Sequence, residues 1–253
     1  MKITLLGTGT SQGVPVIGCD CTVCQSTDPK DNRLRVSALI EVAGKTLVID
    51  TGPDFRYQML RAKVKRLDAI LFTHEHKDHI AGLDDVRAFN YFQQEAMEVY
   101  AHKRVQESLI REFHYAFSAI KYPGVPLINL NEIKNEPFDV QGVGITPVEV
   151  LHYKLPVLGF RIGDFTYITD AKTVSDVEKA KIKGSKVLVI NALQKDKHIS
   201  HFTFDEAIEF AKEINADKTY FTHISHRLGR HKDISKELPE GIELAFDGLV
   251  LDL

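Results

Sequence analysis

Four metal-ligand side chains fall within six residues, from His74 to His79, in the pattern His-x-His-x-Asp-His. They follow the apolar run 68–73, which predicts a buried strand that ends at the first histidine. Open α/β sheets bind their ligands at the carboxyl ends of strands, where this loop would lie. If the backbone stays extended, His74 and His76 point to one place, and Asp78 and His79 turn toward a second. The run therefore predicts two neighbouring metal ions.

Three more residues of ligand type, His152, Asp170 and His223, each come directly after a predicted strand. A single histidine or aspartate at a strand end is more often a turn residue. Together with the run at His74, however, these residues would place four such positions on one face of the fold. The expected site is open and contains many oxygen ligands, whereas structural zinc sites are closed and rich in thiols.

All three cysteines of the chain share one short segment: Cys19, Cys21 and Cys24. An odd number at this spacing cannot form a closed disulfide framework, so we expect the loop 18–26 to aim three thiolates at one point. Three thiolates leave one position of a tetrahedral zinc site open, and His226 is the expected fourth ligand. His198 and His231 are rival fourth ligands. A redox-active thiol cluster and ordinary loop cysteines remain alternatives.

His201 comes just before an expected helix, 204–214, which begins with a capping box. The partly positive end of a helix disfavours a histidine cation and attracts phosphate. We therefore expect His201 to donate a proton to a leaving oxygen, although a simple surface histidine is the alternative. Arg33, Arg35 and Lys172 are weaker candidates for contacts with a substrate phosphate.

The order of these motifs, over nearly the whole chain, resembles the metallo-β-lactamase-fold hydrolases. Asp50, in the sequence Ile-Asp-Thr-Gly, belongs to the same pattern. The resemblance implies that Asp170 bridges two metal ions and that Asp50 braces the metal loop from outside the ligand set. It implies that the first ion is held by His74, His76 and His152, and the second by Asp78, His79 and His223.

Within that family, the cysteine loop and the pattern His223-x-x-His226 look like the phosphoribosyl 1,2-cyclic phosphate phosphodiesterase-like branch. The pattern His201-x-Thr203 resembles the related transfer-RNA 3′-processing endonucleases, tRNase Z. The resemblance implies two divalent ions in the active site, zinc or manganese, and one structural zinc ion. Asp78 and His201 would be the catalytic residues.

The composition suits one large domain, expected to span residues 1–253, with 43% hydrophobic residues. A formal net charge of -3 gives no field for broad binding of nucleic acid. No apolar run approaches the ~20 residues of a membrane span, and no signal peptide is recognisable. We therefore expect a cytoplasmic protein with no membrane partner.

The elements alternate between strands and helices in two similar halves, which predicts an α/β fold with four layers in the order helix, sheet, sheet, helix. Helices are expected over 53–63, 83–92, 104–119, 174–182 and 204–214. Strands are expected over 2–9, 36–42, 45–50, 68–73, 144–151, 159–162, 165–169, 186–192 and 218–222. A terminal hairpin would turn near Asp247-Gly248. Aromatic residues of the segment 104–119 would cover the site or contact a second copy in a homodimer.

The function that fits these features best is hydrolysis of a small cyclic or nucleotide-like phosphodiester by hydroxide held between two metal ions. One alternative is a ribonuclease that processes transfer-RNA 3′ ends, although the protruding basic, glycine-rich arm of that enzyme has no counterpart in 104–122. Another is a lactone or thioester hydrolase. Outside enzymes, the alternative is a non-catalytic metal-binding or redox protein built on the cysteine loop.

Overall fold

The computed structural model describes residues 1–120 and 122–253. Its strands form two seven-stranded sheets, in the orders β14-β1-β2-β3-β4-β5-β6 and β13-β12-β11-β10-β9-β8-β7. The first sheet contains β1 (Lys2–Gly7), β2 (Ser37–Val42), β3 (Lys45–Ile49), β4 (Ala69–Leu71), β5 (Met97–Ala101), β6 (Ile128–Glu132) and β14 (Val250–Asp252). The second contains β7 (Phe138–Val140), β8 (Val143–His152), β9 (Leu155–Ile162), β10 (Phe165–Tyr167), β11 (Val187–Asn191), β12 (Lys218–Thr222) and β13 (Ile242–Leu244).

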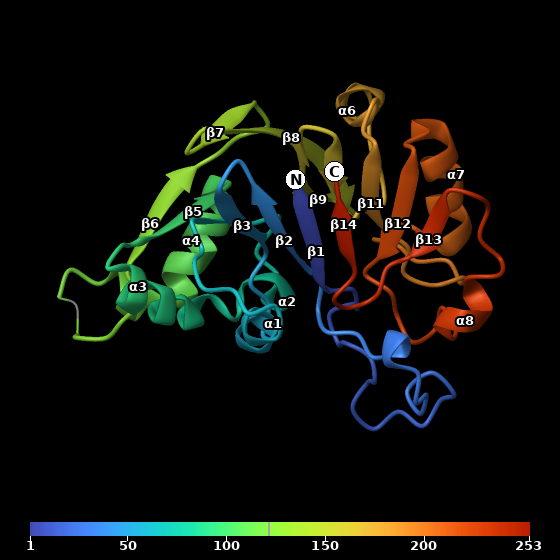
Figure 1. The fold of residues 1–253 in the computed structure, drawn as a ribbon, viewed down its shortest axis with the longest axis horizontal. Helices are drawn as coiled ribbons and strands as arrows, with labels where there is room; N and C mark the ends of the chain where they lie inside the picture. The colour runs from blue at the N-terminus through green and yellow to red at the C-terminus, as the bar shows by residue number, and fades with distance from the viewer. Residues whose placement is uncertain (121) are drawn as a thin grey trace.

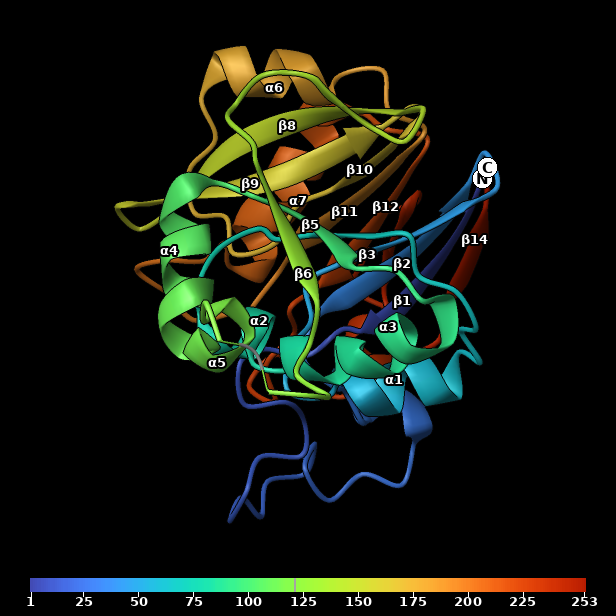
Figure 2. The ribbon, with the colours of Figure 1, turned by 90° about the vertical axis from the view of Figure 1, so that its left-hand side faces the viewer.

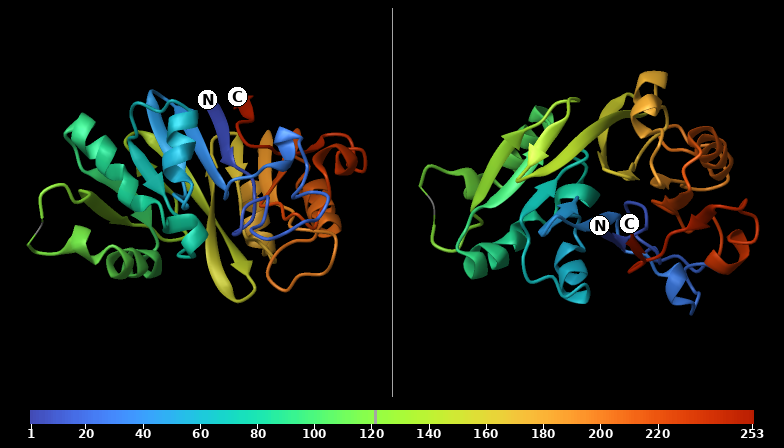
Figure 3. Two further views of the ribbon diagram at one scale, coloured as in Figure 1. Left: turned by 90° about the horizontal axis from the view of Figure 1, so that it is seen from below. Right: turned by 45° about the horizontal axis from the view of Figure 1, so that its top comes forward.

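Helices cover the outer faces of the sheets, so that the molecule has four layers (Figures 1 and 3). The helices of the first half are α1 (Phe55–Arg61), α2 (Lys77–Ile80), α3 (Arg87–Gln93), α4 (Lys103–Glu112) and α5 (His114–Phe117). Those of the second half are α6 (Asp176–Ile182), α7 (Phe204–Ile214) and α8 (His231–Ile234). Short 3-10 turns span Pro29–Asp31 and Leu83–Val86. The predicted four-layer α/β fold is confirmed.

Three apolar clusters fill the spaces between these layers. One lies between the sheets and includes Ile40, Phe160 and Tyr167; the other two lie beneath the helices of each half. All five residues of β11 are buried, as expected for a parallel strand covered on both faces. Among the described residues, no helix is both long and apolar enough to cross a membrane.

The C-terminal strands differ from the expected hairpin. β13 pairs with β12 in the second sheet, whereas β14 pairs antiparallel with β1 in the first, with Leu251 opposite Ile3. The turn near Gly248 therefore carries the chain from one sheet to the other. Buried Leu251 covers the inner core and gives β1 a second neighbour, which a local turn signal cannot reveal.

The helices between residues 83 and 119 are also more broken than expected. The expected helix 83–92 is a 3-10 turn followed by α3. The expected helix 104–119 is interrupted at Phe113, whose backbone leaves helical geometry (φ -114°, ψ 37°) before α5 begins. Phe113 is buried, and Tyr115 and Phe117 pack partly against the core beneath these helices. These aromatic residues therefore contribute to packing within the chain. Strands β5 to β7 were not predicted.

Candidate metal centre

The run from His74 to His79 occupies the carboxyl end of β4, as predicted. Thr73, just before the run, accepts a backbone hydrogen bond from Leu158 N of β9 (3.1 Å), which joins the start of the loop to the second sheet. Helix α2 begins directly after His76 and turns Asp78 and His79 back toward the sheets. His74 and His79 are completely buried.

Asp50 fixes the orientation of two of these histidines. Its Oδ2 accepts hydrogen bonds from His79 Nδ1 (2.7 Å) and from the Thr73 hydroxyl (2.8 Å). Because that hydroxyl donates to Asp50, its oxygen accepts from His74 Nδ1 at 3.0 Å. The Nδ1 atoms of both rings are therefore engaged as donors, and Nε2 is the atom of each ring that is left to face a metal ion. This arrangement of a carboxylate behind a histidine is typical of metal ligands.

The second sheet supplies three more side chains at the same place. His152 ends β8, Asp170 follows β10 and His223 follows β12. Nε2 of His79 and Nε2 of His223 each lie 3.4 Å from a different oxygen of Asp170. His152 Nδ1 donates to the carbonyl of Ser200 (2.9 Å), which leaves Nε2 as the ring nitrogen that can face the site.

Asp50, Asp170 and His223 all adopt left-handed backbone conformations, with φ of 61°, 57° and 54°. Such conformations are uncommon for residues other than glycine and are concentrated at functional sites. Each of these residues comes shortly after a strand ends. The turn of the backbone there directs the side chain of that residue into the seam between the sheets. The same device therefore positions one bracing carboxylate and two candidate ligands.

Charges within the site favour a bound cation. Burial alone would raise the pKa of Asp170, but His223 and His79 hold it well below its usual range. Burial opposes protonation of His79, but Asp170, Asp50 and Asp78 raise its pKa well above the ordinary value. Burial, followed by the neighbouring His79, keeps the pKa of His74 far below the normal value. Asp170 is therefore ionised and attracts positive charge, which a divalent ion would supply in place of the proton on His79.

Buried polar atoms without hydrogen bonds provide a second test of whether these residues fit a metal ion. His79 Nε2 and both ring nitrogens of His223 lack hydrogen-bond partners, as does His201 Nδ1. Unsatisfied polar atoms at such depth are rare and need an explanation. A metal ion between them would satisfy these nitrogens, so the donor set fits a metal site.

The grouping of ligand atoms places Asp170 at the centre. Atoms within 4.8 Å of one another form three groups: His74, His79 and Asp170; Asp78, His79 and His223; and His152, Asp170 and His201. In the expected first set of His74, His76 and His152, the ring centroids lie 4.5 to 5.8 Å apart, and Nε2 of His74 is 2.9 Å from Nδ1 of His76. The structure therefore brings all seven predicted ligands to one site and adds His201 to its edge.

His201 lies immediately before α7, whose capping box joins Thr203 and Glu206. Its Nδ1 is 3.8 Å from an oxygen of Asp170, and its ring stacks on His223 at 4.7 Å. Burial, followed by the neighbouring His223, lowers its pKa to about 2. The ring is therefore neutral in this arrangement, and a role as proton donor requires negative charge beside it in addition to that of Asp170.

The cysteine loop forms a separate cluster with His226. The sulfur atoms of Cys19, Cys21 and Cys24 lie 3.3, 3.4 and 3.5 Å from His226 Nδ1. Ligands around a tetrahedral zinc ion, with Zn–S near 2.3 Å and Zn–N near 2.05 Å, would be about 3.5 Å apart. A backbone hydrogen bond from Cys24 is the main cause that lowers the pKa of Cys21 to about 6. These four residues fit a zinc ion.

The two rival fourth ligands lie elsewhere. His231 Nδ1 accepts a hydrogen bond from buried Arg33 (3.2 Å), and the His198 ring lies 5.0 Å from that of His201. The cysteine loop is tied to the main site through the chain, because His226 is three residues beyond His223. Between them, Ile224 exchanges backbone hydrogen bonds with Thr8 and Thr10 of the N-terminal turn.

The basic residues considered for substrate contact all have partners in the protein. Arg33 is buried and donates to Thr8 and to the carbonyl of Ala245. Arg35 pairs with Asp54 at 3.1 Å, and Lys172 pairs with Glu206 at 2.7 Å. Each is therefore explained as a structural residue.

Sequence reasoning did not identify Thr73 and Ser200, which orient His74 and His152. Their only sequence signal is proximity to the candidate ligands and His201.

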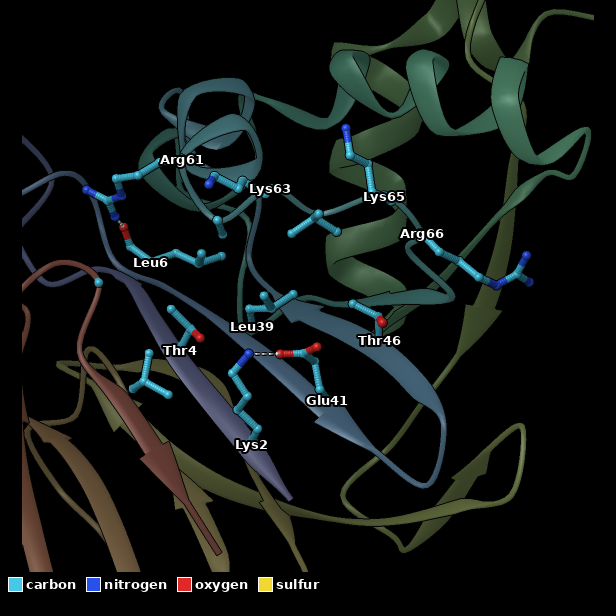
Figure 4. Close-up of a pocket in the computed structure, with 14 residues that line it drawn as sticks. Lys2, Thr4, Leu6, Leu39, Glu41, Thr46, Arg61, Lys63, Lys65 and Arg66 are labelled. Atoms are coloured by element: carbon cyan, nitrogen blue, oxygen red, sulfur yellow. Dashed lines mark hydrogen bonds and ion pairs between the residues drawn. The ribbon is translucent and has the colours of Figure 1, made fainter.

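A separate hollow of about 470 Å³ lies on the outer face of the first sheet (Figure 4). Its rim carries Lys63, Lys65 and Arg66, and no histidine or cysteine lines it. The candidate chemistry therefore belongs to the seam.

The four-layer fold and the histidine-aspartate site together define a class of hydrolase. Residues 45–224 match the model of the beta-lactamase superfamily domain, so the chain belongs to that superfamily. The whole chain superposes on the crystal structure of a new diphosphatase from the PhnP family, with a TM-score of 0.93, 40% identity and coverage of 97% of that chain. The predicted membership of the metallo-β-lactamase-fold hydrolases is confirmed.

Two curated relatives extend this similarity. The chain is 41% identical, over 98% of its length, to an octanoyltransferase of Porphyromonas gingivalis, but it spans only 51% of that protein. It is 24% identical to ribonuclease Z of Pyrobaculum neutrophilum, over 81% of this chain and 86% of the relative. The expected relationship to the transfer-RNA-processing enzymes is therefore confirmed.

Proposed function

We propose that this protein is a metal-dependent phosphodiesterase that cleaves a small cyclic or nucleotide-like substrate, including diphosphate-linked diesters. The observation that carries the proposal is the position of Asp170, whose two oxygens each lie 3.4 Å from a buried, unpartnered histidine nitrogen. The similarity to a diphosphatase along the whole chain supports chemistry at phosphorus.

The proposed ligand sets use side chains from both sheets. Two ions, zinc or manganese, would lower the pKa of a water molecule and offset the charge of the phosphoryl oxygens. His74, His76 and His152 would hold one ion, and Asp78, His79 and His223 would hold the other, with Asp170 shared between them. Asp50 keeps the Nε2 atoms of His74 and His79 available.

His201 is the proposed proton donor to the departing oxygen. Its neutral ring lies beside Asp170 and at the start of α7, where an anionic phosphate group is attracted. The negative charge of a bound phosphodiester would raise the pKa of His201 toward the working range of a general acid. The residue would therefore gain its proton with the substrate in place.

The cysteine loop is the proposed structural zinc site. Cys19, Cys21, Cys24 and His226 would close the coordination shell, so no position remains for a substrate. Its metal would hold the segment after His223 against the N-terminal turn. Chelators strong enough to remove it should reduce stability as well as activity.

The test is a substrate panel with matched variants. Protein loaded with Zn²⁺ or Mn²⁺ should cleave bis(p-nitrophenyl) phosphate, a ribose cyclic phosphate or a diphosphate diester. Asp78→Ala should abolish turnover, and His201→Ala should lower kcat by roughly 10²- to 10⁴-fold. His114→Gln, an exposed change on α5, is the control. Failure of loaded wild-type protein to cleave any phosphodiester would refute the proposal.

Ribonuclease activity is the second candidate, favoured by the similarity to ribonuclease Z. Precursor transfer RNA and an octanoyl thioester therefore belong in the same panel. Cleavage of the RNA alone would favour the ribonuclease, and cleavage of the thioester alone an acyl hydrolase. An unchanged function in Asp78→Ala would favour a non-catalytic metal-binding protein.

A further inference from the structure

Glu75 lies between two candidate ligands, His74 and His76, yet it takes no part in either ligand set. Its Oε1 forms an ion pair with Nε of Arg104 at 2.8 Å. The side chains are 19% and 33% exposed, and Glu75 Oε2 is buried without a hydrogen bond. The metal loop is thus connected to α4 by a partly buried charge pair.

The other end of the same guanidinium reaches the second sheet. Arg104 Nη2 donates to the carbonyl of Pro156 in β9 at 2.6 Å. Pro156 lies opposite Leu151 in the β8–β9 hairpin, one position from the pair formed by His152 and Leu155. Figure 2 shows α4 beside this hairpin. One arginine therefore contacts both the loop that carries His74 and the β8–β9 hairpin, in which His152 is the last residue of β8.

A small cavity of about 80 Å³ lies beside this connection and is lined by Thr73, Arg104 and Pro156, among others. Its size admits a water molecule beside the contact between Arg104 and Pro156. A backbone hydrogen bond from Leu158 N to Thr73 O also joins the two parts. The guanidinium is thus a second connection across the seam at the metal loop.

We propose that Arg104 is a positioning residue that sets the distance between the His74–His76 loop and His152, and thereby the affinity of the metal ion they would share. The inference rests on the proposed metal site, but not on its substrate. A guanidinium suits this role, because its charge attracts the Glu75 carboxylate while one of its N–H groups donates to the carbonyl of Pro156. Lysine offers a single point charge and cannot reproduce both contacts.

An ordinary surface ion pair would contribute only about 0–1 kcal/mol to folding and nothing specific to metal binding. The two interpretations therefore differ in what they predict for the metal. Partners that orient ligands from behind typically change metal affinity 10- to 100-fold. Changes of this size at constant stability would distinguish positioning from general support of the fold.

The test compares Arg104→Met and Arg104→Lys with Arg111→Met, a control on the same helix whose side chain is 68% exposed. Metal affinity is measured by competition with a chelating dye, and the visible spectrum of Co²⁺-loaded protein reports ligand geometry. Arg104→Met should weaken one of the two active-site ions about 10- to 100-fold and alter the Co²⁺ spectrum. The ion at the cysteine loop should be retained.

Glu75→Gln provides the second variant and should reproduce this loss. The double variant should be little worse than either single change, because both remove the same connection. Affinity and spectrum equal to those of Arg111→Met, in folded Arg104→Met or Glu75→Gln protein, would overturn the proposal. If loaded wild-type protein cleaves no phosphodiester, the proposed function fails while this metal-binding result still decides the role of Arg104.

Discussion

At the scale of single residues, the site depends on hydrogen bonds that determine which histidine nitrogens remain free. Asp50 accepts from His79 and Thr73, and Thr73 in turn accepts from His74. The order of ligand types along the sequence indicates where metals would bind. It does not show this proton arrangement, because Asp50 meets Thr73 only when β3 and β4 pair in parallel.

Asp50→Asn should therefore weaken metal binding without removing a ligand. The amide gives His79 and Thr73 a poorer acceptor and disturbs the orientation of both rings. We expect a loss of metal affinity of roughly 10- to 100-fold, measured by chelator competition. Asp54→Asn, which alters a carboxylate paired with Arg35 nearby, is the control and should leave affinity unchanged. Equal affinities in both variants would contradict this account.

His231 should make stability depend on pH. Burial, followed by the charge of Arg33, lowers its pKa from 6.5 to about 4. The unfolded chain therefore binds more protons than the folded chain between these values, so this contribution is present above about pH 6.5 and lost as pH falls toward 4. Between pH 7 and pH 5, the unfolding equilibrium constant should rise on the order of tenfold through this group.

The measurement is urea unfolding of wild-type protein and His231→Gln from pH 7.5 to pH 5. The variant should be less stable than wild type at pH 7, and the difference should shrink as pH falls. A constant difference over the whole range would show that His231 does not titrate in this way.

At the scale of elements, the ends of strands were predictable and long-range pairings were not. β4, β8, β10 and β12 each end close to a predicted ligand, because buried apolar runs are visible in the sequence. β14 was misassigned to a terminal hairpin, since its pairing with β1 joins opposite ends of the chain. The break at Phe113 was missed because apolar spacing continues across it.

The packing of α2 on the loop after β3 leaves no room for a side chain at Gly52. A Cβ there would lie 2.1 Å from the backbone oxygen of Asp78. Gly52→Ala should destabilise the fold by at least ~2 kcal/mol and weaken metal binding, since the loop and α2 must separate. Gly144→Ala in β8, where a Cβ meets nothing within 4 Å, should stay within about 0.5 kcal/mol of wild type. Similar losses of denaturation free energy in both variants would contradict this explanation.

At the scale of the whole molecule, the candidate site lies where two sheets meet, so neither half of the chain contains the complete proposed ligand set. The first sheet contributes the run from His74 to His79, and the second contributes His152, Asp170 and His223. Metal binding should therefore stabilise the assembled sandwich as a unit.

The outer face of α1 and α3 offers a surface for a second copy. Tyr57, Leu60, Tyr91 and Phe92 are 59–79% exposed there. Two of them, Leu60 and Phe92, line an apolar groove of about 610 Å³, and Lys63, Lys65 and Asp85 line it as well. Both signs of charge on one face allow two copies to pair about a twofold axis.

We therefore expect a homodimer through this face. Phe92→Ser combined with Leu60→Ser should shift the mass measured by light scattering from dimer to monomer. Ile199→Ser, which removes another exposed apolar side chain, should not. A wild-type protein that is monomeric at tens of micromolar would rule out this interface as a stable one.

The most direct test of the metal-dependent site is metal analysis of protein purified without added metal, together with phosphodiester cleavage. We predict about three metal ions per chain, of which mild chelation removes two, along with activity that returns on adding Zn²⁺ or Mn²⁺. The remaining ion should be lost when Cys19, Cys21 and Cys24 are replaced by serine. Undiminished cleavage by protein stripped of its two exchangeable ions would contradict the account.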